Sequence, residues 1–160
     1  MKILFAADHA GFNLKQELLP FVRDLGYEVE DWGAFEYNEQ DDYPDIMVPV
    51  AKAVAREPDN LRGIIIGGSG QGEAMAANRV HNARAIVFNG QYKPENDDRY
   101  MPNEIVISKL HNNANILSLG ARFLNLEEAK RAVKLWLESE FNNEERHVRR
   151  IRKIEKLTSS

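Results

Sequence analysis

The feature that most constrains this fold is the alternation of short apolar runs with segments of helical periodicity. The runs that read as strands are 2–7, 27–32, 63–66, 84–88 and 115–119. The segments with helical spacing are 12–25, 44–56, 73–79, 126–137 and 142–157. Such alternation indicates an α/β fold, and apolar strands indicate a parallel sheet covered on both sides. Because 160 residues suit one core, we expect a single domain over residues 1–160.

Prolines and glycines mark the expected ends of helices. Gly26 stops the first helix, and Pro44 lies near the start of the second. Pro20 lies inside the first helical segment, so it predicts a kink or a break there. The polar, acidic stretch 35–43 is predicted to be a loop.

Composition excludes several classes of chemistry. The chain has no cysteine, which removes disulfides, thiolate metal sites and a cysteine nucleophile. Its net charge of −4 argues against non-specific nucleic-acid binding. The N-terminal apolar run is too short for a signal peptide, and no stretch approaches membrane length. We therefore expect a cytoplasmic protein with neither a membrane nor a nucleic acid as partner.

A glycine-rich turn, Gly67-Gly68-Ser69-Gly70-Gln71-Gly72-Glu73, follows the third predicted strand. Glycine lets several main-chain N–H groups point at one ligand, and a following helix adds partial positive charge. The turn is therefore a candidate cradle for a phosphate or an oxyanion, with a tight ligand-free turn as the alternative. It lacks the third glycine of the dinucleotide fingerprint and the Gly-Lys-Ser/Thr ending of a Walker loop. Glu73 suits either a helix-dipole partner or a catalytic base.

Other polar motifs lie next to the predicted strands or in the last helix. Each has a plain structural reading: Asp8-His9 as cap and packed imidazole, His111-Asn112 as loop polarity, and the basic last helix as a solvated face. Together, in an acidic chain, they favour an anion site. The motifs are Asp8-His9, His111-Asn112, Arg122, and Arg146-His147-Val148-Arg149-Arg150.

Taken in order along the chain, these motifs resemble the ribose-5-phosphate isomerase B family, which includes the galactose-6-phosphate isomerase subunits. The matching stretches are Ala7-Asp8-His9-Ala10-Gly11-Phe12, Asp42-Tyr43-Pro44, Gly68-Ser69-Gly70-Gln71-Gly72 with Ala76-Ala77-Asn78, His111-Asn112-Asn113-Ala114-Asn115 with Leu119-Gly120-Ala121-Arg122, and Arg146-His147-Val148-Arg149-Arg150.

The resemblance implies a three-layer Rossmann-like fold. It also implies a homodimer or tetramer whose active sites lie between subunits, with helix 142–157 reaching the partner. The implied reaction converts ribose 5-phosphate and ribulose 5-phosphate through a cis-enediolate, without metal or cofactor. The alternatives are a hexose 6-phosphate substrate, such as allose or galactose 6-phosphate, or a non-catalytic sugar-phosphate-binding protein.

The resemblance also implies roles for individual residues. Glu73 would be the base, Asp8 and His111 would open the furanose ring, and Asn112 would bind a sugar hydroxyl. Ser69 and the main chain of the glycine turn would hold the enediolate oxygens. The remaining expected substrate-binding residues, mostly for the phosphate, are His9, Gly68, Gly70, Gln71, Gly72, Arg122, Arg146, His147 and Arg150.

Two departures from the family pattern are informative. Many members carry a catalytic cysteine where this chain has Gly67, and the sequence Gly-Gly-Ser-Gly-x-Gly-Glu is similar to a subgroup that uses the glutamate instead. Residues 91–102 resemble an insertion. It would be a lid, a dimer contact, a determinant of sugar identity, or a tolerated surface loop.

Overall fold

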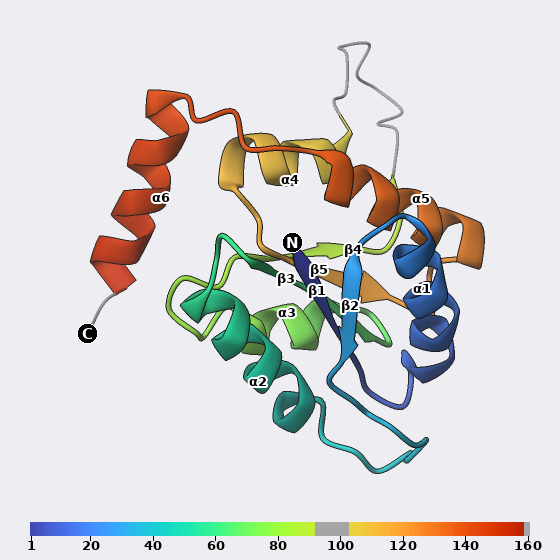
Figure 1. The fold of residues 1–160 in the computed structure, drawn as a ribbon. Coiled ribbons are helices and arrows are strands. Elements are labelled where there is room, and N and C mark those ends of the chain that lie inside the picture. Colours follow the sequence, from blue (N-terminus) through green and yellow to red (C-terminus); the bar gives the residue numbers. More distant parts are fainter. Residues whose placement is uncertain (92–102, 159–160) are drawn as a thin grey trace, which may run out of the picture.

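The computed structural model describes residues 1–91 and 103–158 and contains one parallel sheet of five strands (Figure 1). The strands are β1 (Lys2–Ala7), β2 (Glu28–Asp31), β3 (Leu61–Gly67), β4 (Ala85–Phe88) and β5 (Ile116–Gly120). They run side by side in the order β2-β1-β3-β5-β4. The predicted α/β fold with a five-stranded parallel sheet is confirmed.

Helices cover both faces of this sheet, which gives the three layers. Helices α1 (Phe12–Asp24), α4 (Glu104–Asn112) and α5 (Leu126–Glu138) pack on one face, and α2 (Tyr43–Arg56) and α3 (Gln71–Ala77) on the other. Strand β1 explains the apolar runs: Phe5 faces the first cluster and Leu4 the second, so both faces of the strand are buried. None of the helices in the described ranges combines the length and apolarity that crossing a bilayer requires.

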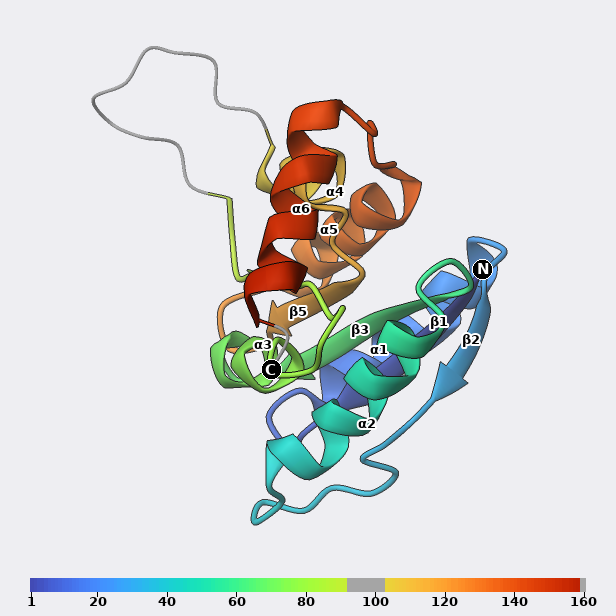
Figure 2. The same cartoon turned by 90° about the vertical axis from the view of Figure 1, so that its left-hand side faces the viewer.

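The last helix, α6 (Glu145–Thr158), stands away from the sheet (Figures 1 and 2). Its buried residue is His147, near its first turn. Near its other end, the Glu155 carboxylate accepts a hydrogen bond from the Asn82 main chain at 3.3 Å. The helix is therefore tied to the body at its two ends.

The structure corrects three of the sequence predictions. His111-Asn112 is not in a loop but forms the last turn of α4, a helix that the sequence reading did not assign. Helix α3 begins at Gln71 rather than at Glu73, so half of the glycine turn is helical. Of the kink or break predicted at Pro20, the break is wrong, because α1 runs through Pro20 as one helix. The predicted insertion at 91–102, apart from Gln91, lies outside the described residues.

The strand order changes direction at β1, because the strands that follow β1 in the sequence lie on both sides of it. From β1 the chain turns to β2 on one side, whereas β3 pairs with β1 on the other side. Ala7 and Ile66 are register partners, and the Asp8 N–H donates to the Ile66 carbonyl at 3.2 Å. Such sheets bind ligands beyond the carboxyl ends of their strands, between connections that diverge. We call this region, beyond the ends of β1 and β3, the crevice.

Candidate active site

The turn after β3 is held in place by the end of β5. The Gly67 and Gly68 carbonyls accept from the main-chain N–H groups of Ala121 and Arg122 at 2.8 and 3.0 Å. The Ser118 hydroxyl donates to the Gly70 carbonyl at 2.6 Å. Gly70 has φ +76°, a conformation that side chains disfavour. The turn is therefore a fixed backbone shape.

The second half of the turn is the first turn of α3. N–H groups there have no partner within a helix, so they are available to a ligand or a nearby side chain. The Gln71 N–H donates to the Ser69 hydroxyl at 3.3 Å. A Cβ atom on Gly72 would lie 3.0 Å from the Tyr43 ring and hydroxyl. Tyr43 therefore borders the crevice, although its sequence indicated only the start of a helix.

Glu73 is the acid buried in this crevice, with 5% of its surface exposed. Its carboxyl group lies against Gly67, and a Cβ atom at that position would overlap it. Burial raises the pKa of Glu73, and the neighbouring Asp8 carboxylate raises it further; its own main-chain N–H and Arg122 oppose the rise. A carboxyl with a raised pKa can accept and return a proton under ordinary conditions.

Asp8, His9 and Arg122 surround the same crevice. Asp8 is buried and its Oδ1 accepts from the Gly11 N–H at 3.0 Å. The Nδ1 atom of His9 lies 2.6 Å from Oδ1 of Asp41, and this hydrogen bond raises the pKa of His9. The Arg122 guanidinium packs against Gly68, where a Cβ atom would lie 3.2 Å from its Cζ. Arg122 thus places a positive charge beside the buried carboxyls, and His9 adds a second one when it is protonated.

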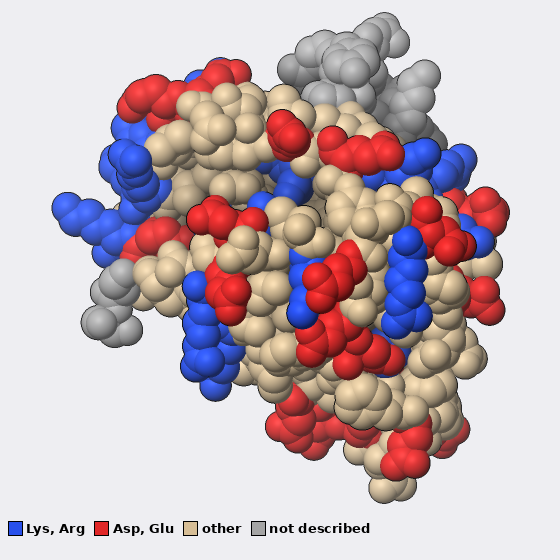
Figure 3. All heavy atoms as spheres, viewed as in Figure 1, with Lys and Arg blue, Asp and Glu red and all other residues tan. Residues whose placement is uncertain are grey.

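The other predicted residues gather at the junction of α4 and α6. The rings of His111 and His147 are stacked, with centroids 4.3 Å apart and planes 9° apart. Burial lowers the pKa of His147, and His111 lowers it further. Arg146 and Arg150 are exposed, and Arg146 donates to Glu144 at 2.7 Å. In Figure 3, lysines and arginines gather over α6, while acids gather at the bottom, over the loop before α2.

These two groups of residues lie at opposite ends of the parallel strands, the first at their carboxyl ends and the second at their amino ends. Asn112 ends α4, and the residues after it bond to the starts of neighbouring strands: Asn113 and Asn115 accept from Arg84 and Gly63. Strand β5 then runs the whole way to the crevice, roughly 16 Å for its five residues. The chain therefore does not bring its second group to its own crevice. The crevice group is Asp8, His9, Gly68, Ser69, Gly70, Gln71, Gly72, Glu73 and Arg122, and the α4–α6 group is His111, Asn112, Arg146, His147 and Arg150.

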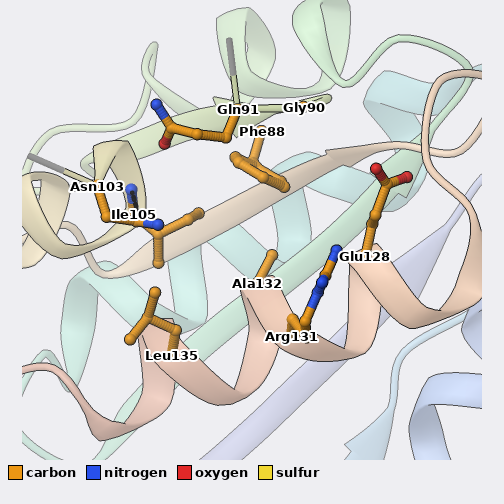
Figure 4. A pocket seen from close by; sticks show the side chains of 9 residues that line it. All are labelled: Phe88, Gly90, Gln91, Asn103, Ile105, Glu128, Arg131, Ala132 and Leu135. Atoms are coloured by element: carbon orange, nitrogen blue, oxygen red, sulfur yellow. Dashed lines mark hydrogen bonds between the residues drawn. The ribbon is translucent and has the colours of Figure 1, made fainter. Parts of the chain in front are cut away.

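A separate pocket lies between α4, α5 and the end of β4 (Figure 4). Two charged residues line it, Glu128 and Arg131, and Glu128 forms a capping box with Asn125. It contains none of the predicted site residues. Across the described ranges, no three histidine, cysteine, aspartate or glutamate side chains form a group that could hold a metal ion. The predicted site residues Asp8, His9 and Glu73 thus lie in the crevice and not in this pocket.

The sequence assigns no site role to two crevice residues besides Tyr43, although it predicts that the Phe88–Asn89 segment lies at the carboxyl end of a strand. Asp41 belongs to the acidic stretch that the sequence predicts to be a loop. Asn89, just after β4, donates to the Ser69 carbonyl at 3.3 Å. Their positions in the sequence could have indicated them, because both residues come after strands whose carboxyl ends lie on the crevice side of the sheet.

The chain is similar to known proteins in both sequence and fold. The model of the ribose/galactose isomerase family matches residues 3–154. Ribose-5-phosphate isomerase B of Escherichia coli is 37% identical over 154 residues, covering 96% of this chain and 93% of that protein. The structure of the Clostridium thermocellum ribose-5-phosphate isomerase B has 41% identity and a TM-score of 0.85, covering 98% of this chain and 97% of that one. A Mycoplasma genitalium ribose-5-phosphate isomerase B with bound ribulose-5-phosphate has 32% identity and a TM-score of 0.87, covering 98% and 95%. The chain therefore belongs to the ribose/galactose isomerase family and is an aldose–ketose isomerase.

Proposed function

We propose that this isomerase interconverts ribose 5-phosphate and ribulose 5-phosphate, with Glu73 as the base that moves the proton. The observation that carries the proposal is a buried carboxyl of raised pKa at the edge of a main-chain N–H turn. Relatives named ribose-5-phosphate isomerase B, one of them with bound ribulose-5-phosphate, support the choice of sugar.

The proposed chemistry needs one base and a set of hydrogen-bond donors. Glu73 removes the proton from C2 of the open-chain aldose, and the electron pair forms the C1–C2 double bond as the C1 carbonyl becomes an enediolate oxygen. The proton of the C2 hydroxyl passes to O1, and Glu73 returns its proton to C1. Ser69 and the N–H groups of the turn stabilise the negative oxygens. Asp8 and His111 assist ring opening before this step.

The phosphate would lie at the cationic end of the site. His9 and Arg122 belong to the crevice at the carboxyl ends of the strands. Arg146 and Arg150 lie on α6, beyond the amino ends of the strands. One chain cannot bring both pairs to one phosphate. We therefore propose a homodimer in which each crevice receives α6 and the end of α4 from the partner, with Asn112 on a sugar hydroxyl.

We also place the chain in the glutamate-base subgroup, without a catalytic metal. The support is steric: the Glu73 carboxyl occupies the space that any side chain at position 67 would need. A cysteine there and this glutamate conformation exclude each other. The steric argument therefore favours Glu73, rather than a side chain at position 67, as the base.

The test is the variant Glu73→Gln, which keeps the shape and removes the proton acceptor. The proposal predicts a fall in kcat of at least about 1,000-fold with KM changed little, a size in line with loss of a general base. Met75→Gln is the control, since Met75 is exposed on the same helix. Wild-type turnover by Glu73→Gln would rule out this base.

A panel of aldose phosphates tests the sugar. The enzyme should form ketose from ribose 5-phosphate with a higher kcat/KM than from allose 6-phosphate or galactose 6-phosphate. Binding of ribose 5-phosphate without exchange of its C2 hydrogen with deuterated water would instead indicate a binding protein. Preference for a hexose phosphate would move the function to that substrate.

A further inference from the structure

His9 is held from one side by an acidic residue with no assigned role. Asp41 Oδ1 lies 2.6 Å from His9 Nδ1, and the Asp41 side chain is only 10% exposed. A carboxylate that is mostly removed from water needs a donor or a cation beside it. The imidazole of His9 is that partner in this structure.

The loop that carries Asp41 is itself fixed onto α1. The Tyr37 ring meets the Phe12 ring edge-on with centroids 6.3 Å apart. The buried Lys15 donates to the Ala34 carbonyl and to Asp31, both at 2.6 Å. These contacts join the start of the loop to the helix that follows Asp8-His9. Asp41 is therefore carried by an anchored segment rather than by a free surface loop.

Charge at the ring follows from its neighbours. The hydrogen bond to Asp41 raises the pKa of His9, burial opposes the rise, Asp8 and the charge of Asp41 add to it, and Arg122 lowers the pKa. Asp8 comes from the β1–α1 connection, Asp41 from the loop before α2, and Arg122 from the connection after β5. Together these groups raise the pKa of His9, and a protonated imidazole donates from both ring nitrogens.

We propose that Asp41 is a positioning residue, which fixes the His9 ring through Nδ1 so that the Nε2–H donates to the substrate phosphate. This inference rests on the proposed function, because it deepens the role of His9 in holding sugar phosphate. Carboxylate partners orient histidine rings and fix their tautomer in the same way at other functional sites. Asp41 acts through His9, so its loss weakens phosphate binding while the proton-transfer step at Glu73 continues.

The test begins with the ionisation of His9, measured by NMR on the substrate-free protein. Four histidines are present, and the His9→Asn variant assigns the His9 signal by its loss. In the wild type the pKa of His9 should exceed the ordinary 6.5. Asp41→Asn should lower it, because the hydrogen bond from the Asp41 carboxylate is the largest cause of the rise. Glu39→Gln, which removes an exposed charge from the same loop, should leave it unchanged.

Binding and turnover supply the second readout. At pH 7.5, Asp41→Asn should bind inorganic phosphate roughly tenfold more weakly and raise KM for ribose 5-phosphate by a similar factor, with kcat kept within about threefold. In a His9→Asn background, Asp41→Asn should add no further loss, because the two residues act as a unit.

Several outcomes would overturn the inference. They are a His9 pKa at or below 6.5 in the wild type, equal titration in wild type and Asp41→Asn, or independent losses in the double variant. The NMR and phosphate measurements use no sugar. A protein that passes them but does not isomerise ribose 5-phosphate would refute the proposed function and not this role of Asp41.

Discussion

At the scale of single residues, the crevice has room for one acidic side chain between β3 and α3. Gly67 has no Cβ atom, and the Glu73 carboxyl lies in the space that a side chain at 67 would take. Dense packing means that even one added carbon displaces its neighbours. The glycine is therefore as necessary to the proposed base as the glutamate itself.

Gly67→Ala should displace the Glu73 carboxyl and lower kcat by roughly 100-fold. Overpacking should also lower the free energy of unfolding by about 1–3 kcal/mol, measured by urea denaturation. The matched control is Gly67→Ala combined with Glu73→Ala, which removes the overlapping atoms. That double variant should regain stability but remain inactive; full activity in Gly67→Ala would contradict the packing argument.

The pH dependence of kcat/KM should report Glu73. The group works when deprotonated, and burial raises its pKa above the ordinary 4.5, so activity should fall through an acid limb above pH 4.5. Asp8 contributes to this rise, so Asp8→Asn should move the limb to lower pH besides lowering the rate. Asp24→Asn, an exposed acid at the end of α1, is the control. A limb that stays in place in Asp8→Asn would show that the two carboxyls are not coupled.

Ionisation of Glu73 should also limit the stability of the fold. Because its folded-state pKa is raised, the native protein holds this proton more tightly than the unfolded chain. Stability should therefore fall as pH rises from the unfolded pKa through the folded one. Glu73→Gln should then have a Tm higher by about 1–4 °C at pH 7.5 and a smaller difference at pH 4. An equal Tm difference at both values would exclude this cause.

At the scale of elements, the sheet could be predicted because its strands are buried on both faces. Runs such as 63–66 are apolar throughout, and only a two-sided core requires that. Helix α4 could not be found in this way, because its buried residues are Ile105, Ser108 and Lys109. Two polar side chains on the packed face remove the apolar period. Asn103, which caps α4, was the available signal.

The histidine pair shows the same limit at the site. The sequence identifies His111 and His147 as candidate site residues. The stacking of their rings, however, depends on how α4 meets α6. Nothing in the spacing of the two motifs predicts that contact. Asp41 was missed for a related reason, since an acidic loop has no pattern that distinguishes a structural acid from a solvated one.

Pro20 gives a prediction at this scale. Helix α1 continues through it although proline lacks the N–H for the bond to Gln16 and costs about 3 kcal/mol inside a helix. Pro20 is exposed, so Pro20→Ala should raise the free energy of unfolding by roughly 1–2 kcal/mol after the gain in unfolded-chain entropy. Pro44→Ala, at the start of α2 where proline is compatible, should give no gain. Lower stability of Pro20→Ala would mean that the proline is needed in α1.

At the scale of the whole molecule, the predicted site residues form two groups separated by the length of the sheet. The crevice group lies at the carboxyl ends of β1 and β3, and the α4–α6 group lies at the opposite edge. The order of the motifs along the chain already implies this separation, because His111 precedes β5 and Arg122 follows it, so the two residues lie at opposite ends of that strand. A homodimer with two-fold symmetry is the simplest assembly in which each crevice receives α6 from the other copy of the chain.

Mixing two inactive variants tests the shared site most directly. One is Glu73→Gln, and the other is Arg146→Ala with Arg150→Ala, so each damages a different group. After the two proteins are unfolded together and refolded, half of the dimers should be mixed, each with one intact site. The account predicts recovery of roughly a quarter of wild-type activity. Mixed dimers that are confirmed by native mass spectrometry and remain inactive would contradict it.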